Sequence, residues 1–245
     1  MLEIKNLHKS FGGVKAVNNC SFSVKPNTIT ALIGPNGAGK STIFNLISSI
    51  QDVDLGNIYL DGNDITNLRI EEVSKLGISR MFQKSRLFDN LTVKENLLLA
   101  LDVEDTKFFR NFFGKNKVTK EKLKEINRIL EIVEMKEYLK KRAGDLSYGQ
   151  KRLVELARVI LKPHRILLLD EPVAGVNPKL RKIISKVLLD LKTKGETILL
   201  IEHDMNFTLG ISDEVIVLDE GKLLVKGTPK EIKNNPKVLE AYLGE

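Results

Sequence analysis

Residues 34–41 read Gly34-Pro35-Asn36-Gly37-Ala38-Gly39-Lys40-Ser41 and form the most informative motif of the chain. It follows a mostly apolar run, Thr28 to Ile33, and precedes apolar residues at helical spacing between Ser41 and Ser49. This order predicts a strand, a glycine-rich loop and a helix, the context in which GxxxxGK[ST] binds phosphate through inward-pointing N–H groups. We expect Lys40 to neutralise the β- and γ-phosphates and Ser41 to ligate Mg²⁺. The alternative, a glycine-rich turn without a ligand, leaves the full match unexplained.

A second candidate site follows the apolar run Ile166 to Leu169, which leads into Asp170, Glu171 and Pro172. Neighbouring side chains on a strand point to opposite faces, so the two carboxylates can meet one ligand only where the strand ends. Pro172 favours such an end. Asp170 then suits the Mg²⁺ shell, and Glu171 suits a base that orients water near the γ-phosphate. The alternative is a buried strand with a solvated acidic end, which the upstream phosphate loop disfavours.

Strand-like runs alternate with helical runs along much of the chain. The alternating segments Leu2 to Leu7 and Ala16 to Val24 predict half-buried strands of an N-terminal β region. From about Leu91 to Leu161 apolar residues recur every three or four positions, which predicts a helical insert. The remaining alternation favours a mostly parallel sheet covered by helices, with ligand sites at the carboxyl ends of its strands. The other expected strands are Gly77 to Phe82, Arg165 to Asp170, Glu196 to Ile201 and Glu214 to Leu218, with a hairpin over 57–65 and a helix from Pro178 to Lys194.

A phosphate loop alone leaves kinases, GTPases, helicases and transport ATPases open. The segment Leu146 to Arg152 reads LSYGQKR and precedes a helical run. It resembles the LSGGQ signature of ABC ATPases, with Tyr148 in place of the first glycine. Ser147 and Gly149 at a helix start would form an anion site, and a plain Ser147 N-cap is the other interpretation. The place of this segment shortly before Asp170 favours the signature.

The resemblance to ABC ATPases implies roles for residues that would be unremarkable alone. Gln83 matches the Q-loop glutamine and His203 the switch histidine, although a lone histidine is more often a surface or capping residue. Phe11 lies where the family stacks an aromatic ring on adenine, with a core phenylalanine as the alternative. Asn177 lies in the D-loop, where many relatives carry Asp. The resemblance implies that the catalytic residues are Lys40, Gln83, Glu171 and His203. It implies that the Mg²⁺ ligands are Ser41, Gln83 and Asp170. The implied nucleotide contacts are Phe11, Val17, Gly34, Pro35, Asn36, Gly37, Ala38, Gly39, Lys40, Ser41, Thr42, Ser147, Tyr148, Gly149, Gln150 and Asn177.

The resemblance covers essentially the whole chain and is strongest to the ATP-binding subunits of branched-chain amino-acid importers. Related subunits for urea import or lipopolysaccharide export share part of the pattern and stay open. The implied fold is an α/β P-loop NTPase domain over residues 1–245, with a mostly parallel core sheet and an N-terminal antiparallel β subdomain. A helical subdomain would be inserted at about 88–161, and a subfamily tail would occupy about 219–245. The segments that match are Phe11 to Gly13, Ala16 to Asn19, Arg86 to Phe88, Glu95 to Leu98, Ala174 to Pro178, Glu202 to Met205, Asn234 to Pro236 and Ala241 to Glu245.

The same resemblance implies ATP and Mg²⁺ as cofactors and an ATP-sandwiched dimer. Ser147 of one subunit would close over the nucleotide held by the phosphate loop of a second ATP-binding subunit, identical or paralogous. Such a two-fold interface would supply the phosphate that the Ser147 anion site lacks within its own domain. Membrane-spanning permease subunits and a separate cargo-binding protein are the other implied partners, and those subunits choose the cargo.

Composition indicates where such a protein works. The single cysteine, Cys20, cannot form an internal disulfide, which fits a reducing compartment. Residues 1–12 lack the continuous apolar stretch of a signal peptide. The most apolar windows, such as Thr197 to Ile201, fall far short of the roughly 20 residues that cross a bilayer. We therefore expect a peripheral protein at the cytoplasmic face of the cell membrane.

Most of the net charge of +7 lies between Lys107 and Lys124, among four phenylalanines at helical spacing. One hypothesis places this stretch against acidic lipid headgroups, and the other packs the phenylalanines inside the helical arm. A soluble ABC ATPase would use it as a nucleic-acid-binding arm, but such proteins usually carry two cassettes or a long coiled-coil insert, so nucleic acid is a disfavoured partner. A GTPase or small-molecule kinase is also disfavoured, because Asn116-Lys117 is not followed by the aspartate of the guanine-specific NKxD motif.

Overall fold

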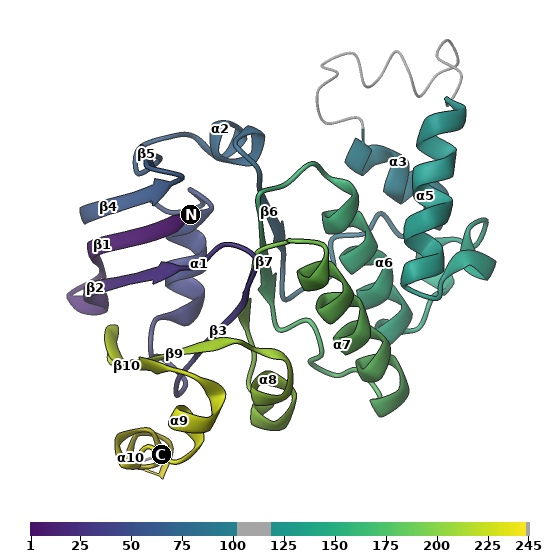
Figure 1. Cartoon of the computed structure of the whole chain (residues 1–245). Coiled ribbons are helices and arrows are strands. Elements are labelled where there is room, and N and C mark those ends of the chain that lie inside the picture. The colour runs from purple at the N-terminus through teal and green to yellow at the C-terminus, as the bar shows by residue number, and fades with distance from the viewer. Residues whose placement is uncertain (102–118, 244–245) are drawn as a thin grey trace. The chain divides into compact units, whose positions relative to one another are not determined.

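The computed structural model describes residues 1–101 and 119–243. The chain divides into two compact units (Figure 1). Unit 1 comprises Met1–Arg80, His164–Pro172 and Leu188–Glu245, and unit 2 comprises Met81–Pro163 and Val173–Val187. The extents expected for the helical subdomain and for the C-terminal tail stay predictions. Residues 107–118 of the basic stretch lie outside the described residues.

The N-terminal region of unit 1 forms a four-stranded sheet in the order β2-β1-β4-β5, and its neighbouring strands are antiparallel. In β1, Leu2 and Ile4 are buried while Lys5 is exposed, which is the alternation of a sheet with one covered face. The expected hairpin over 57–65 is present and joins β4 to β5. The strands are β1 (Leu2–Phe11), β2 (Val14–Val24), β4 (Leu55–Leu60) and β5 (Asn63–Asp64).

A second sheet has six strands in the order β10-β9-β3-β8-β7-β6. Strands β9, β3, β8 and β7 pair in parallel, whereas β10 runs antiparallel to β9. Every residue of β3, β7 and β8 is buried, as expected for parallel strands covered on both faces. The prediction of a mostly parallel sheet is therefore confirmed. The strands are β3 (Ile29–Ile33), β6 (Ile78–Met81), β7 (Ile166–Asp170), β8 (Ile198–Ile201), β9 (Glu214–Asp219) and β10 (Lys222–Gly227).

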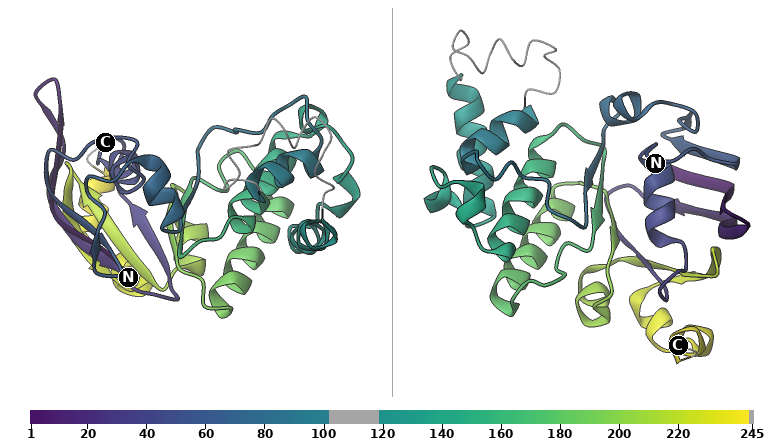
Figure 2. Two further views of the ribbon diagram at one scale, coloured as in Figure 1. Left: turned by 90° about the horizontal axis from the view of Figure 1, so that it is seen from above. Right: turned by 180° about the vertical axis from the view of Figure 1, so that it is seen from behind.

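One apolar cluster in unit 1 draws residues from both sheets and from helix α1. Phe44 of α1 is fully buried in it, which stabilises the fold by about 1.5–3 kcal/mol. Figure 2 shows β10, in yellow, beside β2, in purple, and the Asn18 N–H donates to the Gly221 carbonyl at 2.9 Å. The helices of this unit are α1 (Lys40–Ile47), α2 (Ile70–Lys75), α8 (Met205–Ile211), α9 (Pro229–Lys233) and α10 (Pro236–Leu243).

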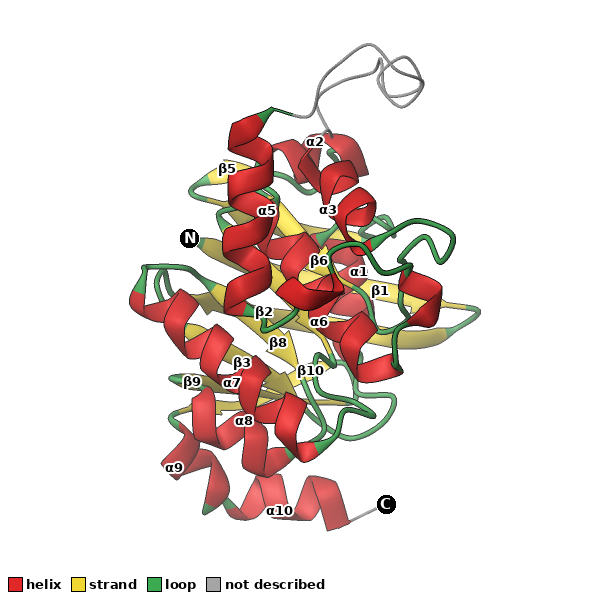
Figure 3. Ribbon diagram, turned by 90° about the vertical axis from the view of Figure 1, so that its right-hand side faces the viewer, coloured by secondary structure: helices red, strands yellow, loops and turns green. Residues whose placement is uncertain are grey.

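Unit 2 consists mainly of helices in its described residues, as Figure 3 shows by colour. Helices α3, α5 and α6 pack against one another, and they bury residues such as Leu97, Ile129 and Leu153. None of the described helices is both long enough and apolar enough to span a bilayer. The helices are α3 (Val93–Leu101), α5 (Lys120–Ile132), α6 (Tyr148–Leu161) and α7 (Pro178–Thr193), which continues into unit 1, with the short helices η2 (Lys136–Tyr138) and η3 (Ala143–Asp145).

Candidate functional site

The glycine-rich loop joins β3 to α1, so the predicted order of strand, loop and helix is confirmed. Gly39 has a φ of +92°, and a Cβ atom there would lie 2.3 Å from the Ala16 carbonyl oxygen. A Cβ atom on Gly34 would lie 2.2 Å from the Leu218 carbonyl oxygen. The loop therefore runs directly against the main chain of β2 and β9, and only glycine fits at these two positions.

Lys40 folds back onto the loop from the first turn of α1. Its Nζ donates to the carbonyl oxygens of Gly34 at 2.6 Å and Pro35 at 2.7 Å, and the residue is 6% exposed. A phosphate oxygen is a stronger partner for an ammonium group than a neutral carbonyl, so the arrangement suits an exchange of partners. Ser41 is exposed at the same turn, and Thr42 is half-buried.

Asp170 is the last residue of β7 and is buried. Its Oδ2 accepts a hydrogen bond from Nη2 of Arg80 at 3.0 Å, in an ion pair whose two side chains are each 7% exposed. Arg80 also donates through Nη1 to Asn45 Oδ1 and Ser48 Oγ, both at 2.8 Å. Sequence reasoning missed Arg80, and the only signal for it was one charged residue within the short run Ile78 to Met81.

Glu171 leaves the strand in an unusual backbone conformation, with a φ of +50°. The strand therefore ends at Asp170, as Pro172 predicted, and the two carboxylates escape the alternation of a regular strand. A left-handed conformation strains a residue with a Cβ atom by about 1–3 kcal/mol and is found preferentially at functional sites. The main-chain N–H of Glu171 donates to the Ile201 carbonyl at 2.9 Å, which fixes this turn against the end of β8.

His203 reaches Glu171 from the segment between β8 and α8. Its Nε2 lies 3.1 Å from Glu171 Oε1. The neighbouring Asp204 caps α8 by accepting from the Phe207 N–H at 2.9 Å, which holds the turn that carries the histidine. Two residues predicted separately from sequence thus lie within hydrogen-bonding distance in unit 1. Their catalytic roles stay predictions.

Ser147 in unit 2 is the N-cap of α6. Its Oγ accepts from the Gln150 N–H at 3.3 Å, and Gln150 Oε1 accepts from the Ser147 N–H at 2.9 Å. The capping interpretation therefore holds. A capping box satisfies only part of the four free N–H groups at a helix start, so it leaves donors for an anion. A Cβ atom on Gly149 would lie 2.5 Å from Leu180 Cδ1, and Tyr148 lies beside Gly175.

Gln83 is held in unit 2 through its main chain. Nη1 of Arg152 donates to the carbonyl oxygens of Phe82 at 2.7 Å and Gln83 at 3.1 Å. Arg152 is fully buried and pairs with Glu155, which accepts the N–H of Arg86 at 2.5 Å. The helix that begins at the signature thus fixes the segment that carries Gln83. Sequence reasoning missed both charged residues, because nothing local shows which backbone they reach.

The structure also shows where three further residues lie that were predicted to contact nucleotide. Phe11 is 44% exposed beside the Lys9 ammonium, so it is not a core phenylalanine. Val17 is buried in the apolar cluster of unit 1. Asn177 Oδ1 accepts the Leu180 N–H at 3.0 Å at the start of α7, so this side chain caps a helix. Whether these residues contact nucleotide stays a prediction.

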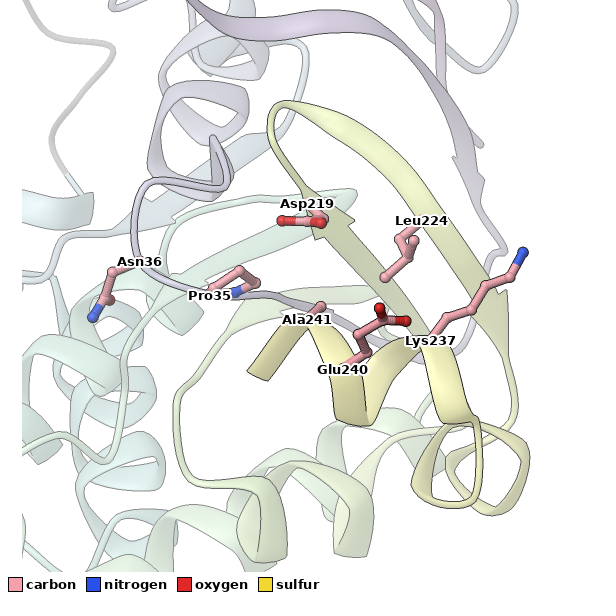
Figure 4. Close-up of a pocket in the computed structure, with 7 residues that line it drawn as sticks. All are labelled: Pro35, Asn36, Asp219, Leu224, Lys237, Glu240 and Ala241. Atoms are coloured by element: carbon pink, nitrogen blue, oxygen red, sulfur yellow. The ribbon is translucent and has the colours of Figure 1, made fainter. Parts of the chain in front are cut away.

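A hollow adjoins the first residues of the phosphate loop (Figure 4). Helix α10 forms one wall with Glu240 and Ala241, and Leu224 of β10 faces them. Pro35 and Asn36 line its edge, whereas Lys40 and Asp170 are not among the lining residues. The C-terminal helix therefore lies next to the loop.

Two oxygen-bearing side chains of unit 1 suit the binding of a magnesium ion alongside nucleotide phosphates. Mg²⁺ prefers oxygen ligands and is usually bound through one or two protein groups plus substrate phosphates. The hydroxyl of Ser41 and the carboxylate of Asp170 are such groups. The described residues hold no cluster of three or more His, Cys, Asp or Glu side chains arranged for a metal.

Comparison with known proteins confirms the predicted resemblance and the α/β fold. A family model described as ABC transporter matches residues 17–174, and one described as branched-chain amino acid ATP-binding cassette transporter matches residues 222–245. The whole chain is 39% identical to the high-affinity branched-chain amino acid transport ATP-binding protein BraF of Pseudomonas aeruginosa, of which 98% is covered.

Solved structures agree with these matches. A nucleotide-free ATP-binding cassette from an ABC transporter superposes with a TM-score of 0.88 at 36% identity, covering 100% of this chain and 99% of that one. The dimeric structure of the bacterial cassette MJ0796 gives a TM-score of 0.80 at 25% identity, covering 94% and 99%. This chain is a member of the ABC transporter family, as an ATP-binding cassette.

Proposed function

We propose that this chain binds and hydrolyses ATP to power an importer of branched-chain amino acids. The contact between Glu171 and His203, in the unit that carries the phosphate loop, is the observation that carries the proposal. The match of residues 222–245 to the branched-chain family model and the name of the BraF relative support the cargo class. They favour it over urea import and lipopolysaccharide export.

Each residue has a distinct part in the reaction. Lys40 would exchange its two loop carbonyls for oxygens of the β- and γ-phosphates. Ser41 and Asp170 would hold Mg²⁺, which would supply positive charge against the phosphate oxygens. Glu171 Oε1 accepts a proton of the attacking water and orients it, while His203 contacts the γ-phosphate. Little covalent chemistry is required, so positioning and charge account for most of the rate.

A second ATP-binding subunit completes the site in this proposal. Ser147 and the N–H groups at the start of α6 would bind the γ-phosphate of the ATP that is held by the partner. Separately, Gln83 would be a further ligand of Mg²⁺. The dimeric structure of MJ0796 supports this arrangement. In this proposal, permease subunits in the membrane respond to the closing and opening of the dimer, and the chain works at the cytoplasmic face of the membrane. A separate binding protein would supply the cargo.

The substitution Glu171→Gln tests the catalytic assignment. It keeps the size of the side chain and removes the base, so ATP should hold the dimer together without being hydrolysed. We expect size-exclusion chromatography with ATP to show a stable dimer for the variant, with ATP turnover lowered about 10²–10⁴-fold. Glu220→Gln is the matched control, because Glu220 also has a positive φ, of 42°, and is exposed. A persistent monomer, or equal turnover in both variants, contradicts the assignment.

The cargo class needs a separate measurement. The chain is combined with its permease and binding protein in liposomes, and uptake of labelled leucine is compared with that of urea in the presence of ATP. We expect ATP-dependent uptake of leucine only. Uptake of urea but not leucine would contradict the cargo and leave the ATPase assignment intact.

A further inference from the structure

The Arg80 side chain is 7% exposed and pairs with Asp170, one of the two proposed magnesium ligands. Its guanidinium reaches the Asp170 carboxylate on β7 at 3.0 Å, and it also reaches Asn45 on α1 and Ser48, the C-cap of α1, at 2.8 Å each. The aromatic ring of Phe44 lies under it, with the guanidinium carbon 5.5 Å from the ring centroid. One side chain therefore joins two elements whose ends carry functional groups.

These two elements are the ones that carry Ser41 and Asp170. Helix α1 begins at Lys40 and bears Ser41 in its first turn, and β7 ends at Asp170. A metal ligated by both groups requires a fixed separation and orientation between them. The described structure shows Arg80 bonded to α1 and to the carboxylate itself, so it fixes that relation directly.

The hydrogen-bonding geometry requires arginine. The planar guanidinium carries donors in a rigid fork, and here two nitrogens serve three acceptors in different directions. A lysine ammonium is a point charge on a flexible stem, so it would keep the charge but could not hold the three groups in one arrangement. The ion pair is nearly water-free, with each side chain 7% exposed, so an imperfect partner would leave Asp170 poorly oriented.

We propose that Arg80 is a positioning residue for Mg²⁺ binding, which it promotes by fixing the Asp170 carboxylate relative to helix α1. The inference rests on the proposed function, because that function assigns Mg²⁺ to Ser41 and Asp170. Groups that orient a ligating carboxylate act through the ligand, and their loss typically lowers metal affinity about 10–100-fold. In this proposal Arg80 acts through the Asp170 carboxylate and is not itself a metal ligand.

The test is metal binding by the full chain with Arg80→Lys. Mn²⁺ replaces Mg²⁺ as the probe, and electron paramagnetic resonance measures free Mn²⁺ during titration in the presence of ADP. We expect about 10–100-fold weaker Mn²⁺ binding in the variant. Binding of ADP in EDTA, measured by calorimetry, should stay unchanged, because it depends on the phosphate loop. A merely structural role would lower both.

Arg165→Lys is the matched control for this change. Arg165 directly precedes β7 at the end opposite Asp170, and its ion pair with Asp61 is exposed, at 61% for the arginine. The Arg165→Lys variant should bind Mn²⁺ as the natural chain does.

Asn45→Ala is a second test variant. It keeps Arg80 and Asp170 paired but removes one hydrogen bond between Arg80 and α1, so it should also weaken Mn²⁺ binding, but less than Arg80→Lys does. It carries the test if Arg80→Lys does not fold.

The outcomes separate the two proposals. If the natural chain with ADP binds no Mn²⁺, the proposed function fails. If the natural chain binds Mn²⁺ and both Arg80→Lys and Asn45→Ala bind it equally well or more tightly, only the role of Arg80 is overturned. Tighter binding would mean that the guanidinium competes with the metal for Asp170.

Discussion

Sequence reasoning missed two arginines, Arg80 in unit 1 and Arg152 in unit 2, whose side chains are 7% and 0% exposed and which bond to different kinds of partner. Arg80 bonds to side chains on other elements, and its acidic partner, Asp170, is a proposed metal ligand. Arg152 bonds to main-chain carbonyls and to Glu155 on its own helix. The first arginine thus orients one functional group, whereas the second holds a segment of chain in place.

Because their partners differ, Arg80 should affect metal binding and Arg152 should affect the folding stability of unit 2. Replacing Arg80 by lysine keeps the charge and disturbs the carboxylate, so its main effect should be on metal binding. Replacing Arg152 removes the partner of a buried carboxylate and two backbone hydrogen bonds, so its main effect should be on the folding of unit 2. Three measurements test the contrast between the two regions.

Arg152→Met should give the largest effect. It leaves Glu155, whose side chain is 4% exposed, without its buried cation, and breaking such a pair typically destabilises a protein by about 3–5 kcal/mol. We expect hydrogen exchange, followed by mass spectrometry, to accelerate in α6 and in residues 82–86. The amides of β3 in unit 1 should keep their protection.

The control for Arg152 is Arg128→Met. Arg128 pairs with Glu125 on α5 of the same unit, but both side chains are exposed, at 53% and 43%. An exposed pair of this kind contributes about 0–1 kcal/mol. Equal loss of protection in both variants would show that burial does not distinguish them, and the comparison of the two regions would lose its basis.

Helix caps give a smaller contrast. Ser147 caps α6 in unit 2 and Thr228 caps α9 in unit 1, and replacing either by alanine should lower the free energy of unfolding by about 1 kcal/mol. If Ser147 also binds the partner's γ-phosphate, Ser147→Ala should lower ATP turnover beyond what equal destabilisation explains. We would compare turnover with urea midpoints for both variants. A matched loss of turnover would reduce Ser147 to a cap.

Much of the fold could be predicted because its signals are local. The apolar runs of β3 and β7 and the spacing in α6 each indicate their own element, and Pro172 marks the end of β7 at Asp170. Strand β10 and helices α2, α8, α9 and α10 were not predicted. The half-buried strand Lys222–Gly227 has an apolar run of only three residues, Leu223 to Val225, between two lysines, and it pairs with β9.

The candidate site also contains residues that could be predicted from the sequence and contacts that could not. Lys40, Asp170 and Glu171 could be proposed from motifs, because phosphate transfer uses such groups after particular strands, whereas His203 was implied only by the resemblance to ABC ATPases. The geometry of these residues relative to one another could not be predicted. The 3.1 Å contact of His203 with Glu171 depends on the positive φ of Glu171 and on the turn after β8. Arg80 lies 90 residues from Asp170, and no local pattern links them.

The smallest expected effect concerns Cys20, the single cysteine, which lies in the core of unit 1. Burial raises the pKa of its thiol to about 12, partly offset by a hydrogen bond from the Leu223 main chain. The thiolate is the reactive form, so a thiol-exchange reagent at pH 8 should modify Cys20 only when unit 1 opens. Arg152→Met should therefore leave the modification rate unchanged, because it acts in unit 2, and Arg80→Lys should leave it unchanged as well, because its effect is on the Asp170 carboxylate and not on the stability of unit 1. If Arg152→Met raises the rate, the two units unfold together. If Arg80→Lys raises it, Arg80 stabilises unit 1 and the contrast between the two arginines fails.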